Sequence, residues 1–518
     1  MAALQSVYVY ICTDIDVLGN CPKRAGQAPE KVGAEMNTVT RRHALQLIAG
    51  LGLSAYSTNV LSAGDTKTVV IVGAGPAGMS AAWELRKVGH NVRVFEARGR
   101  AGGRMRTLRT PFTDGLYAEA GALFLVSTNP GLVYASELGL EATPIPFRSD
   151  LGSVAFIDGK RVTQTPNTPV EWPVELDEDD TGLSISALQG KYHRQHVYGF
   201  DELEAMADAD FPQSRFQYLD QLSLADFWRR NGASENAIRL MQLRYYHGYG
   251  EGVESSSALQ AFRETASMLG ITGGFQIKGG NDLLCRRMAE NLGSAVAFNA
   301  PVVAIRQDES GASVTVAGND GQESVSADYV VVTVPIHVQH KIEFTPQLST
   351  LRREANSQIM KTPVVRSFIQ TKSRYWEKNN LDGTANTDLP IDTVLHSTMA
   401  QDSPKGILES FAYGKRATHM GALTDKDRRE AVLSGIDAVY PGIREQEERY
   451  THYDWGSDPW ALGGHAAYRP GQVTRFSKAL REPEGRIYFA GDVMGGAPGY
   501  SHAAFASGKN VAATITAL

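Results

Sequence analysis

Cysteine is scarce in this sequence, which has three cysteines among 518 residues. Cys12, Cys21 and Cys285 form no CxxC pair, so neither a disulfide framework nor a structural zinc site is supported. Cys285 lies in the amphipathic pattern GGNDLLCRRMAENLG and is interpreted as a packed thiol rather than a nucleophile. No Ser-His-Asp arrangement or metal-ligand spacing offers a catalytic scheme, so no metal is expected.

A strong charge of one sign is also lacking, since the formal net charge is −6. A charge this small on a long chain argues against nucleic acid, or an anionic membrane, as an obligate partner. The content of 42% hydrophobic and 21% charged residues is typical of a folded globular chain. Because 518 residues exceed what one core ordinarily serves, at least two lobes are expected.

The chain also lacks a long, strongly apolar run near its start. The stretch 44–64 is uncharged but rich in small residues, and it follows the pair Arg41 and Arg42. A twin arginine, a weak apolar region and a small-residue cleavage site after Ala63 resemble a Tat export signal, which carries folded proteins with the cofactor inserted. Residues 1–65 are therefore predicted to be a leader removed on export to the periplasm or medium. Without export the chain would be cytoplasmic, and no stable membrane association is expected.

Residues 69–104 read VVIVGAGPAGMSAAWELRKVGHNVRVFEARGRAGGR and combine an apolar run with spaced glycines. The run predicts a buried parallel strand, after which Gly73, Gly75 and Gly78 form GxGxxG before a helix. These glycines permit a tight turn, close approach of backbone N–H groups to a pyrophosphate, and close packing of the helix. A second strand ends at Glu96, whose carboxylate can accept both ribose hydroxyls. This order of elements predicts a dinucleotide site.

A second glycine pair, Gly102 and Gly103, follows with Arg104 directly after it. A second close backbone approach and a guanidinium suit an extended cofactor whose pyrophosphate is held from two sides. The pattern E-A-x-x-R-x-G-G-R, from Glu96 to Arg104, resembles the FAD-binding signature of flavin amine oxidases. That family includes monoamine oxidases, polyamine oxidases and L-amino acid oxidases, and the resemblance implies FAD as the cofactor.

Further blocks carry the resemblance through most of residues 66–518. AEAGALFL, at 118–125, resembles the segment that passes the flavin ring, and the block at 486–515 resembles the one that brings Asp492 to the ribityl–phosphate region. The resemblance also implies that Val303 lends its backbone to the adenine. The residues so assigned to FAD are Gly73, Gly75, Ala77, Gly78, Glu96, Ala97, Arg98, Gly103, Arg104, Gly121, Ala122, Leu123, Val303, Gly491, Asp492, Tyr500 and Ser501.

Cofactor motifs at both ends of the chain predict the α/β class. We expect a Rossmann-like FAD-binding domain assembled from discontinuous segments, with a mixed α+β substrate domain. The predicted FAD-binding segments are 66–150, 271–343 and 454–518, and the predicted substrate segments are a helix-rich 151–270 and a mixed 344–453. Pockets form preferentially at such domain interfaces, so we expect the substrate there.

Aromatic side chains are expected to line the substrate site beside the flavin, because a dry site favours the neutral amine that can lose a hydride. The resemblance assigns one position to Tyr500, in GYSHAAFASG, and Tyr468 is the candidate for the second. His465 follows a G-G pair where some family members attach flavin through a cysteine. It is interpreted as a residue that lines the substrate cleft.

The chain departs from the family pattern at two positions. L-amino acid oxidases commonly have an arginine for the substrate carboxylate where this chain has Phe124, so either another arginine substitutes or the substrate is an amine without a carboxylate. Many members also place a lysine near flavin N5. Arg366 aligns best with that lysine, Lys361 lies five residues earlier, and the choice stays open. The predicted catalytic residues are Tyr500, Tyr468, Arg366 and Lys361, with Phe124 and His465 at the substrate.

The expected activity is FAD-dependent oxidation of an amine C–N bond by hydride transfer to flavin N5. The imine hydrolyses to a carbonyl compound, and oxygen is the expected acceptor, giving hydrogen peroxide. An L-amino acid oxidase with a different carboxylate anchor is the nearest alternative, and a carbon–carbon desaturase or a non-catalytic protein similar to GDP-dissociation inhibitors would share the fold. The expected partner is a small-molecule amine or amino acid, and the oligomeric state, homodimer included, stays open.

Overall fold

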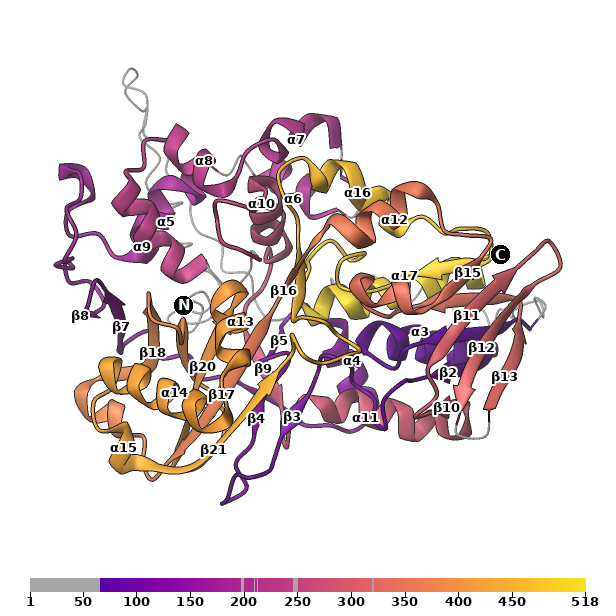
Figure 1. Cartoon of the computed structure of the whole chain (residues 1–518), viewed down its shortest axis with the longest axis horizontal. Coiled ribbons are helices and arrows are strands. Elements are labelled where there is room, and N and C mark those ends of the chain that lie inside the picture. Colours follow the sequence, from indigo (N-terminus) through magenta and orange to yellow (C-terminus); the bar gives the residue numbers. More distant parts are fainter. Residues whose placement is uncertain (1–65, 197–199, 209, 212, 246–249, 319–320) are drawn as a thin grey trace, which may run out of the picture. The chain divides into compact units, whose positions relative to one another are not determined.

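The computed structural model of this chain describes residues 66–518 apart from 197–199, 209, 212, 246–249 and 319–320 (Figure 1). The predicted leader, residues 1–65 with the twin arginine, lies outside the described residues. Residues from Lys67 to Leu518 belong to one compact unit, so the lobes below are parts of a single body. The boundaries predicted between the two domains stay a prediction.

The described chain alternates short strands and helices. The strands are β1 (Thr68–Val72), β2 (Asn91–Phe95), β3 (Thr107–Leu108), β4 (Ala118–Glu119), β5 (Leu125–Val126), β6 (Ala142–Pro144), β7 (Gly152–Ile157), β8 (Lys160–Gln164), β9 (Gly274–Ile277), β10 (Val296–Ala297), β11 (Val302–Gln307), β12 (Ala312–Gly318), β13 (Gly321–Ala327), β14 (Tyr329–Val332), β15 (Glu343–Thr345), β16 (Met360–Thr362), β17 (Val364–Thr371), β18 (Leu381–Thr387), β19 (Thr393–His396), β20 (Gly406–Tyr413), β21 (Glu447–Asp454), β22 (His465–Ala467) and β23 (Ile487–Phe489).

The α-helices are α3 (Pro76–Lys87), α4 (Pro130–Glu137), α5 (Ile185–Tyr192), α6 (Phe200–Ala207), α7 (Gln213–Asp220), α8 (Leu224–Arg230), α9 (Glu235–Tyr245), α10 (Ala258–Ser267), α11 (Asp282–Leu292), α12 (Thr350–Gln358), α13 (Gly414–Ala422), α14 (Asp425–Val439), α15 (Ile443–Gln446), α16 (Gln472–Arg481) and α17 (Ser501–Thr516). Short 3₁₀ turns are η3 (Glu178–Asp180), η4 (Arg194–His196), η6 (Gly293–Ala295), η7 (Ile336–Lys341) and η8 (Tyr375–Asn379).

A parallel sheet in the order β10-β2-β1-β14-β23 lies at the centre of the cofactor lobe. The central strand β1 is an apolar run, and its Val69, Val70 and Ile71 are fully buried because both faces of the sheet are covered there. The strands come from separated parts of the chain, between Thr68 and Phe489. The predicted α/β domain assembled from discontinuous segments is therefore confirmed.

The first and last α-helices of the described chain pack against each other. Figure 1 shows α3, in indigo, beside α17, in yellow. Close contact requires a glycine at Gly508, because a Cβ there would lie 2.1 Å from the Ala77 carbonyl oxygen. The two ends of the described chain thus meet on one lobe.

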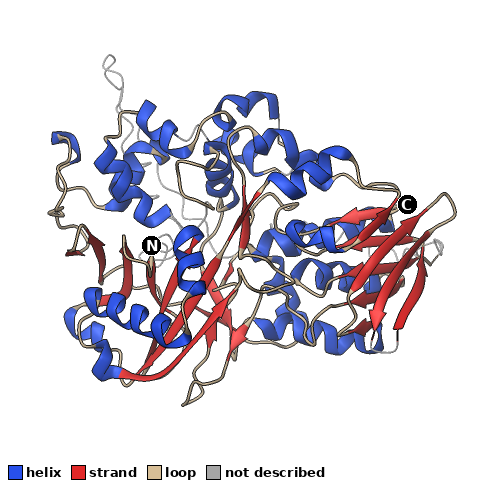
Figure 2. Ribbon diagram, viewed as in Figure 1, coloured by secondary structure: helices blue, strands red, loops and turns tan. Residues whose placement is uncertain are grey.

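A mixed sheet of seven strands, β21-β17-β20-β19-β18-β7-β8, is the core of the second lobe, which is called the substrate lobe below. β17 is buried at every residue, since β20 and β21 pair with it on either side. Figure 2 shows this sheet with the helices α13 and α14 beside it, and the helices α5 to α10 grouped apart from it. Together they form the mixed α+β part that the sequence predicts.

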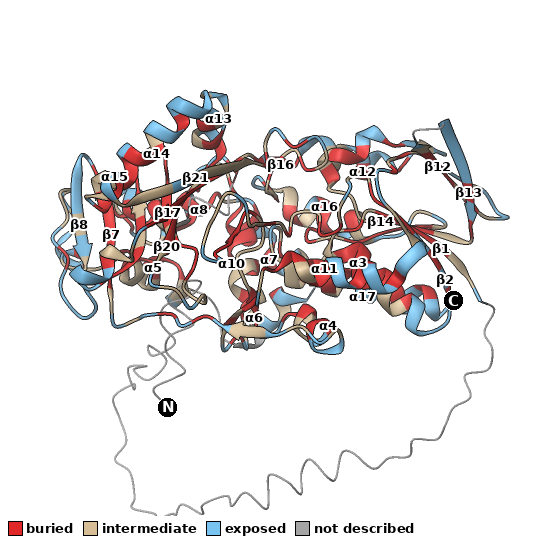
Figure 3. Ribbon diagram, turned by 90° about the horizontal axis from the view of Figure 1, so that it is seen from below, coloured by how far each residue is buried: buried red, intermediate tan, exposed pale blue. Residues whose placement is uncertain are grey.

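Burial follows this arrangement. Figure 3 shows the buried residues gathered along α3, β1 and β17, whereas the edge strands β8 and β13 are largely exposed.

Cys285 is buried, and burial raises the pKa of its thiol well above the ordinary value, which agrees with a packed thiol. None of the helices described in 66–518 has the length and hydropathy of a membrane span. In the same part of the chain no cluster of His, Cys, Asp and Glu is arranged to hold a metal.

Candidate active site

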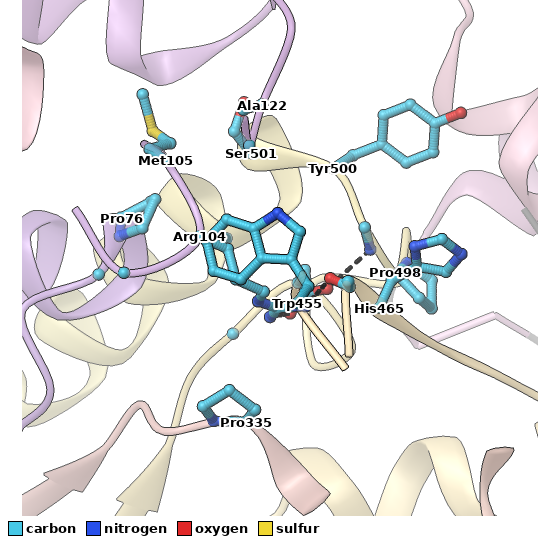
Figure 4. A pocket seen from close by; sticks show the side chains of 18 of the residues that line it. Pro76, Arg104, Met105, Ala122, Pro335, Trp455, His465, Pro498, Tyr500 and Ser501 are labelled. Carbon is cyan, nitrogen blue, oxygen red and sulfur yellow. Dashed lines mark hydrogen bonds and ion pairs between the residues drawn. The ribbon is translucent and has the colours of Figure 1, made fainter. Parts of the chain in front are cut away.

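One cavity of about 380 Å³ joins the cofactor lobe to the substrate lobe. Figure 4 shows part of its wall, including Arg104, Trp455, His465 and Tyr500. The structure brings these sequence-predicted residues to the cavity: Gly73, Gly75, Ala77, Glu96, Ala97, Arg98, Gly103, Arg104, Gly121, Ala122, Leu123, Phe124, Arg366, His465, Gly491, Asp492, Tyr500 and Ser501. Motifs at both ends of the chain therefore converge on one site.

The glycine loops leave no room for side chains on the cavity floor. Gly73 has a φ of +105°, which disfavours any residue with a Cβ. A Cβ on Gly78 would lie 1.9 Å from the Gly73 carbonyl oxygen, so Gly78 packs the helix onto the loop and does not line the cavity. A Cβ on Gly103 would lie 3.2 Å from the Cα of Gly75, so the two glycine loops touch each other.

The N-terminus of α3 opens onto the cavity between these loops. Gly75 is the N-cap, Pro76 follows it, and no acidic side chain occupies the first turn. The positive end of the helix dipole is therefore available to phosphate groups. This arrangement fits a pyrophosphate.

Glu96 is held rigidly at the end of β2. Its two carboxylate oxygens accept hydrogen bonds from the Ala74 and Arg98 N–H groups, both at 2.8 Å. The side chain is buried but lines the cavity, as a carboxylate that binds ribose hydroxyls must.

Arg104 and Asp492 form an ion pair that joins the two cofactor motifs. Arg104 Nη2 lies 2.5 Å from Asp492 Oδ1, and Asp492 Oδ2 accepts a hydrogen bond from Gly499 N–H at 2.7 Å. Burial raises the pKa of Asp492, but the guanidinium and the N–H donor outweigh it, so the pKa lies below its ordinary value. Asp492 is therefore an anion at neutral pH.

Of the two candidates for the lysine position, the structure brings Arg366 and not Lys361 to the cavity. Arg366 lies on β17 with its guanidinium buried, donates to Gly121 O at 2.6 Å and pairs with Glu409. Lys361 lies on the short strand β16 and is exposed. The five-residue separation puts the two side chains in different sheets, which sequence alone could not resolve.

Tyr500 lines the cavity as predicted, but Tyr468 does not. Tyr468 is buried away from it, its N–H donates to Gln260 Oε1 at 2.6 Å, and burial raises the pKa of its phenol. Trp455, from the loop YDWGSDPW, is among the aromatic residues that do line the cavity (Figure 4). Tyr468 directly follows β22 and its side chain is buried in the hydrophobic core, so the structure does not bring this predicted aromatic residue to the cavity.

Three further predictions concern the cavity wall. Phe124 lies there and packs edge-on against Phe147, with ring centroids 6.2 Å apart, so this position offers no carboxylate anchor. His465 also lines the cavity, in agreement with its interpretation. Where the sequence predicts Val303 beside the adenine, the structure places Pro301 and Val302 in the cavity wall and not Val303.

The helix-rich part from α5 to α10 contributes polar residues to the cavity that the sequence analysis did not predict. Arg194 and Arg244 line the cavity from η4 and α9, and Glu264 lines it from α10. The Glu264 carboxylate accepts a hydrogen bond from the Tyr500 hydroxyl, which points away from Trp455 in Figure 4. No motif surrounds these residues, and only tertiary packing brings them to the site.

Comparison with known proteins identifies the class of this chain. The family model "Flavin containing amine oxidoreductase" matches residues 76–516, so the chain belongs to that family. It is an oxidoreductase acting on amine donors, with FAD as its cofactor. The resemblance drawn from the glycine and arginine motifs is confirmed.

Individual relatives differ in substrate. An L-amino-acid oxidase of Sistrurus catenatus edwardsii is 29% identical over 490 residues, covering 90% of this chain and 89% of the relative. A putrescine oxidase bound to putrescine is 26% identical with a TM-score of 0.71, covering 88% of this chain and 99% of that one. A cyclohexylamine oxidase of Brevibacterium oxydans IH-35A, 22% identical with a TM-score of 0.74 over 87% of this chain and 99% of that one, shares the fold.

Proposed function

We propose that the chain oxidises the C–N bond of a small-molecule amine and that molecular oxygen takes up the electrons as hydrogen peroxide. The observation that carries this proposal is the continuity of the cavity, which runs from the FAD loops past Tyr500 and Trp455 to the helices α5, α9 and α10. When bound, FAD supplies the hydride acceptor. The chain's own residues bind the amine, exclude water and take up its proton.

The cavity wall favours a neutral amine. Met268, Leu395, Phe411 and Tyr413 provide apolar and aromatic surface at the substrate end. Burial lowers the pKa of His502, in the same wall, to about 4, so its imidazole is neutral at physiological pH. The same desolvation lowers the pKa of a bound ammonium, so its nitrogen lone pair becomes available.

Glu264 is the carboxylate that we propose takes the ammonium proton. Its carboxylate accepts from the Tyr500 hydroxyl, which fixes it at the cavity wall. A carboxylate within reach of a bound ammonium stabilises that cation before the proton moves and holds the proton at a carboxylate oxygen afterwards. Glu264→Gln is therefore expected to shift the pH optimum for flavin reduction upward.

Anaerobic mixing with primary amines, secondary amines and L-amino acids tests the proposed function. We expect the visible flavin absorbance to bleach with at least one class, and peroxide to appear when air is admitted. Bleaching without peroxide would show a different electron acceptor. Absence of bleaching with every class would refute amine oxidation.

A second candidate is oxidation of an L-amino acid, as the names of several curated relatives suggest. Arg194 and Arg244 favour it, because two guanidinium groups at the substrate end suit a carboxylate and disfavour a second amine. L-norleucine and pentylamine differ only by that carboxylate. For an amino acid oxidase, Arg244→Met should raise the KM for L-norleucine about tenfold and leave pentylamine unchanged. Arg239→Met, exposed on the same helix and paired with Asp158, is the matched control.

We also propose that residues 1–65 direct export by the Tat route after FAD has been inserted. The support is the twin arginine before the weakly apolar stretch. Changing Arg41 and Arg42 to lysine should leave the holoprotein in the cytoplasm, which cell fractionation and flavin fluorescence would measure.

A further inference from the structure

The irregular segment 120–123 lies in the cavity wall, and its carbonyl groups are held by side chains from distant elements. Trp455 Nε1 donates to Ala120 O at 2.6 Å, and Arg366 Nη1 donates to Gly121 O at 2.6 Å. Both donors come from the substrate lobe, one from β17 and one from the loop after β21. The first two carbonyls of the segment are thus fixed from one side.

The next two carbonyls are fixed from the cofactor side. Asn281 Nδ2 donates to Ala122 O at 2.9 Å and to Leu123 O at 3.2 Å. Gln276 Nε2 also donates to Leu123 O, at 2.9 Å. Four consecutive carbonyls therefore accept side-chain hydrogen bonds, and we name the donors Trp455, Arg366, Asn281 and Gln276 the carbonyl clamp.

The clamp residues are themselves held in place. The Arg366 guanidinium pairs with Glu409, whose other oxygen accepts from the Ser397 hydroxyl, and it stacks 4.4 Å from the Phe411 ring. Asn281 Oδ1 accepts from the Ile277 N–H at 2.9 Å. A planar guanidinium can donate to a carboxylate and a carbonyl together, whereas an ammonium lacks that fork. The clamp is therefore rigid and specific to its residue types.

The clamp engages only the carbonyl groups of the segment, so its N–H groups are left for other partners. In the part of the chain that the structure describes, the Ala122 and Leu123 N–H groups have no protein acceptor, and both residues line the cavity. Both residues are partly buried, and N–H groups in a cavity wall that have no protein acceptor are available to bind a ligand. FAD carries acceptor atoms along the edge of its ring system.

We propose that the carbonyl clamp sets the conformation of segment 120–123, which its sequence already assigns to FAD, so that the Ala122 and Leu123 N–H groups face the flavin ring edge. Arg366, Trp455, Asn281 and Gln276 are then positioning residues that act through the backbone and transfer neither proton nor hydride. This role also explains why an arginine stands at position 366. The proposal depends on FAD binding and not on the identity of the amine.

Three single substitutions test the clamp. Trp455→Phe keeps a ring but removes its donor, Arg366→Lys keeps the charge but removes the fork, and Asn281→Asp keeps the acceptor but removes both donors. Matched controls are Trp376→Phe and Arg352→Lys, which alter a buried tryptophan of the substrate lobe and a buried arginine paired with Glu484, both outside the cavity wall.

The main readout is the visible absorption and circular dichroism of bound flavin without substrate. We expect the three clamp variants to change this spectrum in the same sense and to weaken FAD binding about fivefold to tenfold, since each frees the same segment. We expect the controls to lower the melting temperature without changing the spectrum. A clamp also predicts that Trp455→Phe and Arg366→Lys are not additive in one chain, because both act on adjacent carbonyls.

Wild-type flavin spectra and FAD affinities in the folded clamp variants would overturn the proposal. So would spectral changes of the same size in the two controls. If Arg366→Lys does not fold, Trp455→Phe and Asn281→Asp carry the same comparison, because they lie on opposite sides of the segment.

Discussion

Gly78→Ala is expected to displace helix α3 from the first glycine loop and so to weaken FAD binding. The new Cβ would lie 1.9 Å from the Gly73 carbonyl oxygen and 2.8 Å from Thr333 Oγ1, whereas an ordinary contact begins near 3.4 Å. Helix α3 must therefore move away from the glycine loop by more than 1 Å, because the obstacle is backbone. Overpacking of this kind costs about 1–3 kcal/mol. If that cost is paid when the loop closes on the pyrophosphate, FAD affinity falls about 5-fold to 150-fold.

Isothermal titration of the apoprotein with FAD, together with a melting curve, measures this effect. Gly318→Ala is the matched control, since its Cβ would lie 3.6 Å from the nearest atom of the described residues, Gly321 O, and its backbone lies outside the left-handed region. The control should bind FAD as the wild type does. If Gly78→Ala bound FAD with wild-type affinity and melted at the wild-type temperature, the close packing of α3 on the loop would be disproved.

Three further predictions concern two side chains of the cavity wall, Asp492 and Tyr500, and the buried side chain of Glu119. Asp492→Asn should lower FAD affinity and should remove part of the fall in melting temperature that the wild type shows in acid. The folded pKa of Asp492 lies below its ordinary value of 3.8. This carboxylate therefore stabilises the fold above that pH, and the stabilisation is lost as the pH falls. The melting temperature of Glu119→Gln should rise relative to that of the wild type as the pH increases from 5 to 8. Burial raises the folded pKa of Glu119 from 4.5 to about 8, so in that window only the unfolded wild-type chain is ionised and the wild-type fold loses stability. A difference in melting temperature that does not change with pH would contradict this. Tyr500→Phe should slow flavin reduction about tenfold by releasing Glu264, as stopped-flow absorbance would record.

The cofactor half of the site could be predicted from the sequence because its signals are local. The first strand, Gly73, Gly75, Gly78 and Glu96 are neighbours in one βαβ unit, where spacing alone determines geometry. The pair of Arg104 with Asp492 joins distant segments, yet each residue lies in its own recognisable motif. These motifs were sufficient for the fold class and the cofactor.

The substrate half could not be predicted in the same way. Glu264, Arg194 and Arg244 reach the cavity through the packing of helices, and no local pattern marks them. Tyr468 and Trp455 are both aromatic residues near a G-G pair, and only the path of the chain decides which ring faces the cavity. The same holds for Arg366 and Lys361, whose strands belong to different sheets.

The most direct test of the account is anaerobic mixing of the purified holoprotein with amines and amino acids while the flavin spectrum is recorded. The account predicts a yellow protein with stoichiometric FAD whose visible absorbance is bleached by an amine, and a variant lacking the Arg104–Asp492 pair that binds FAD far more weakly. A colourless protein, or bound flavin that no amine reduces, would contradict it.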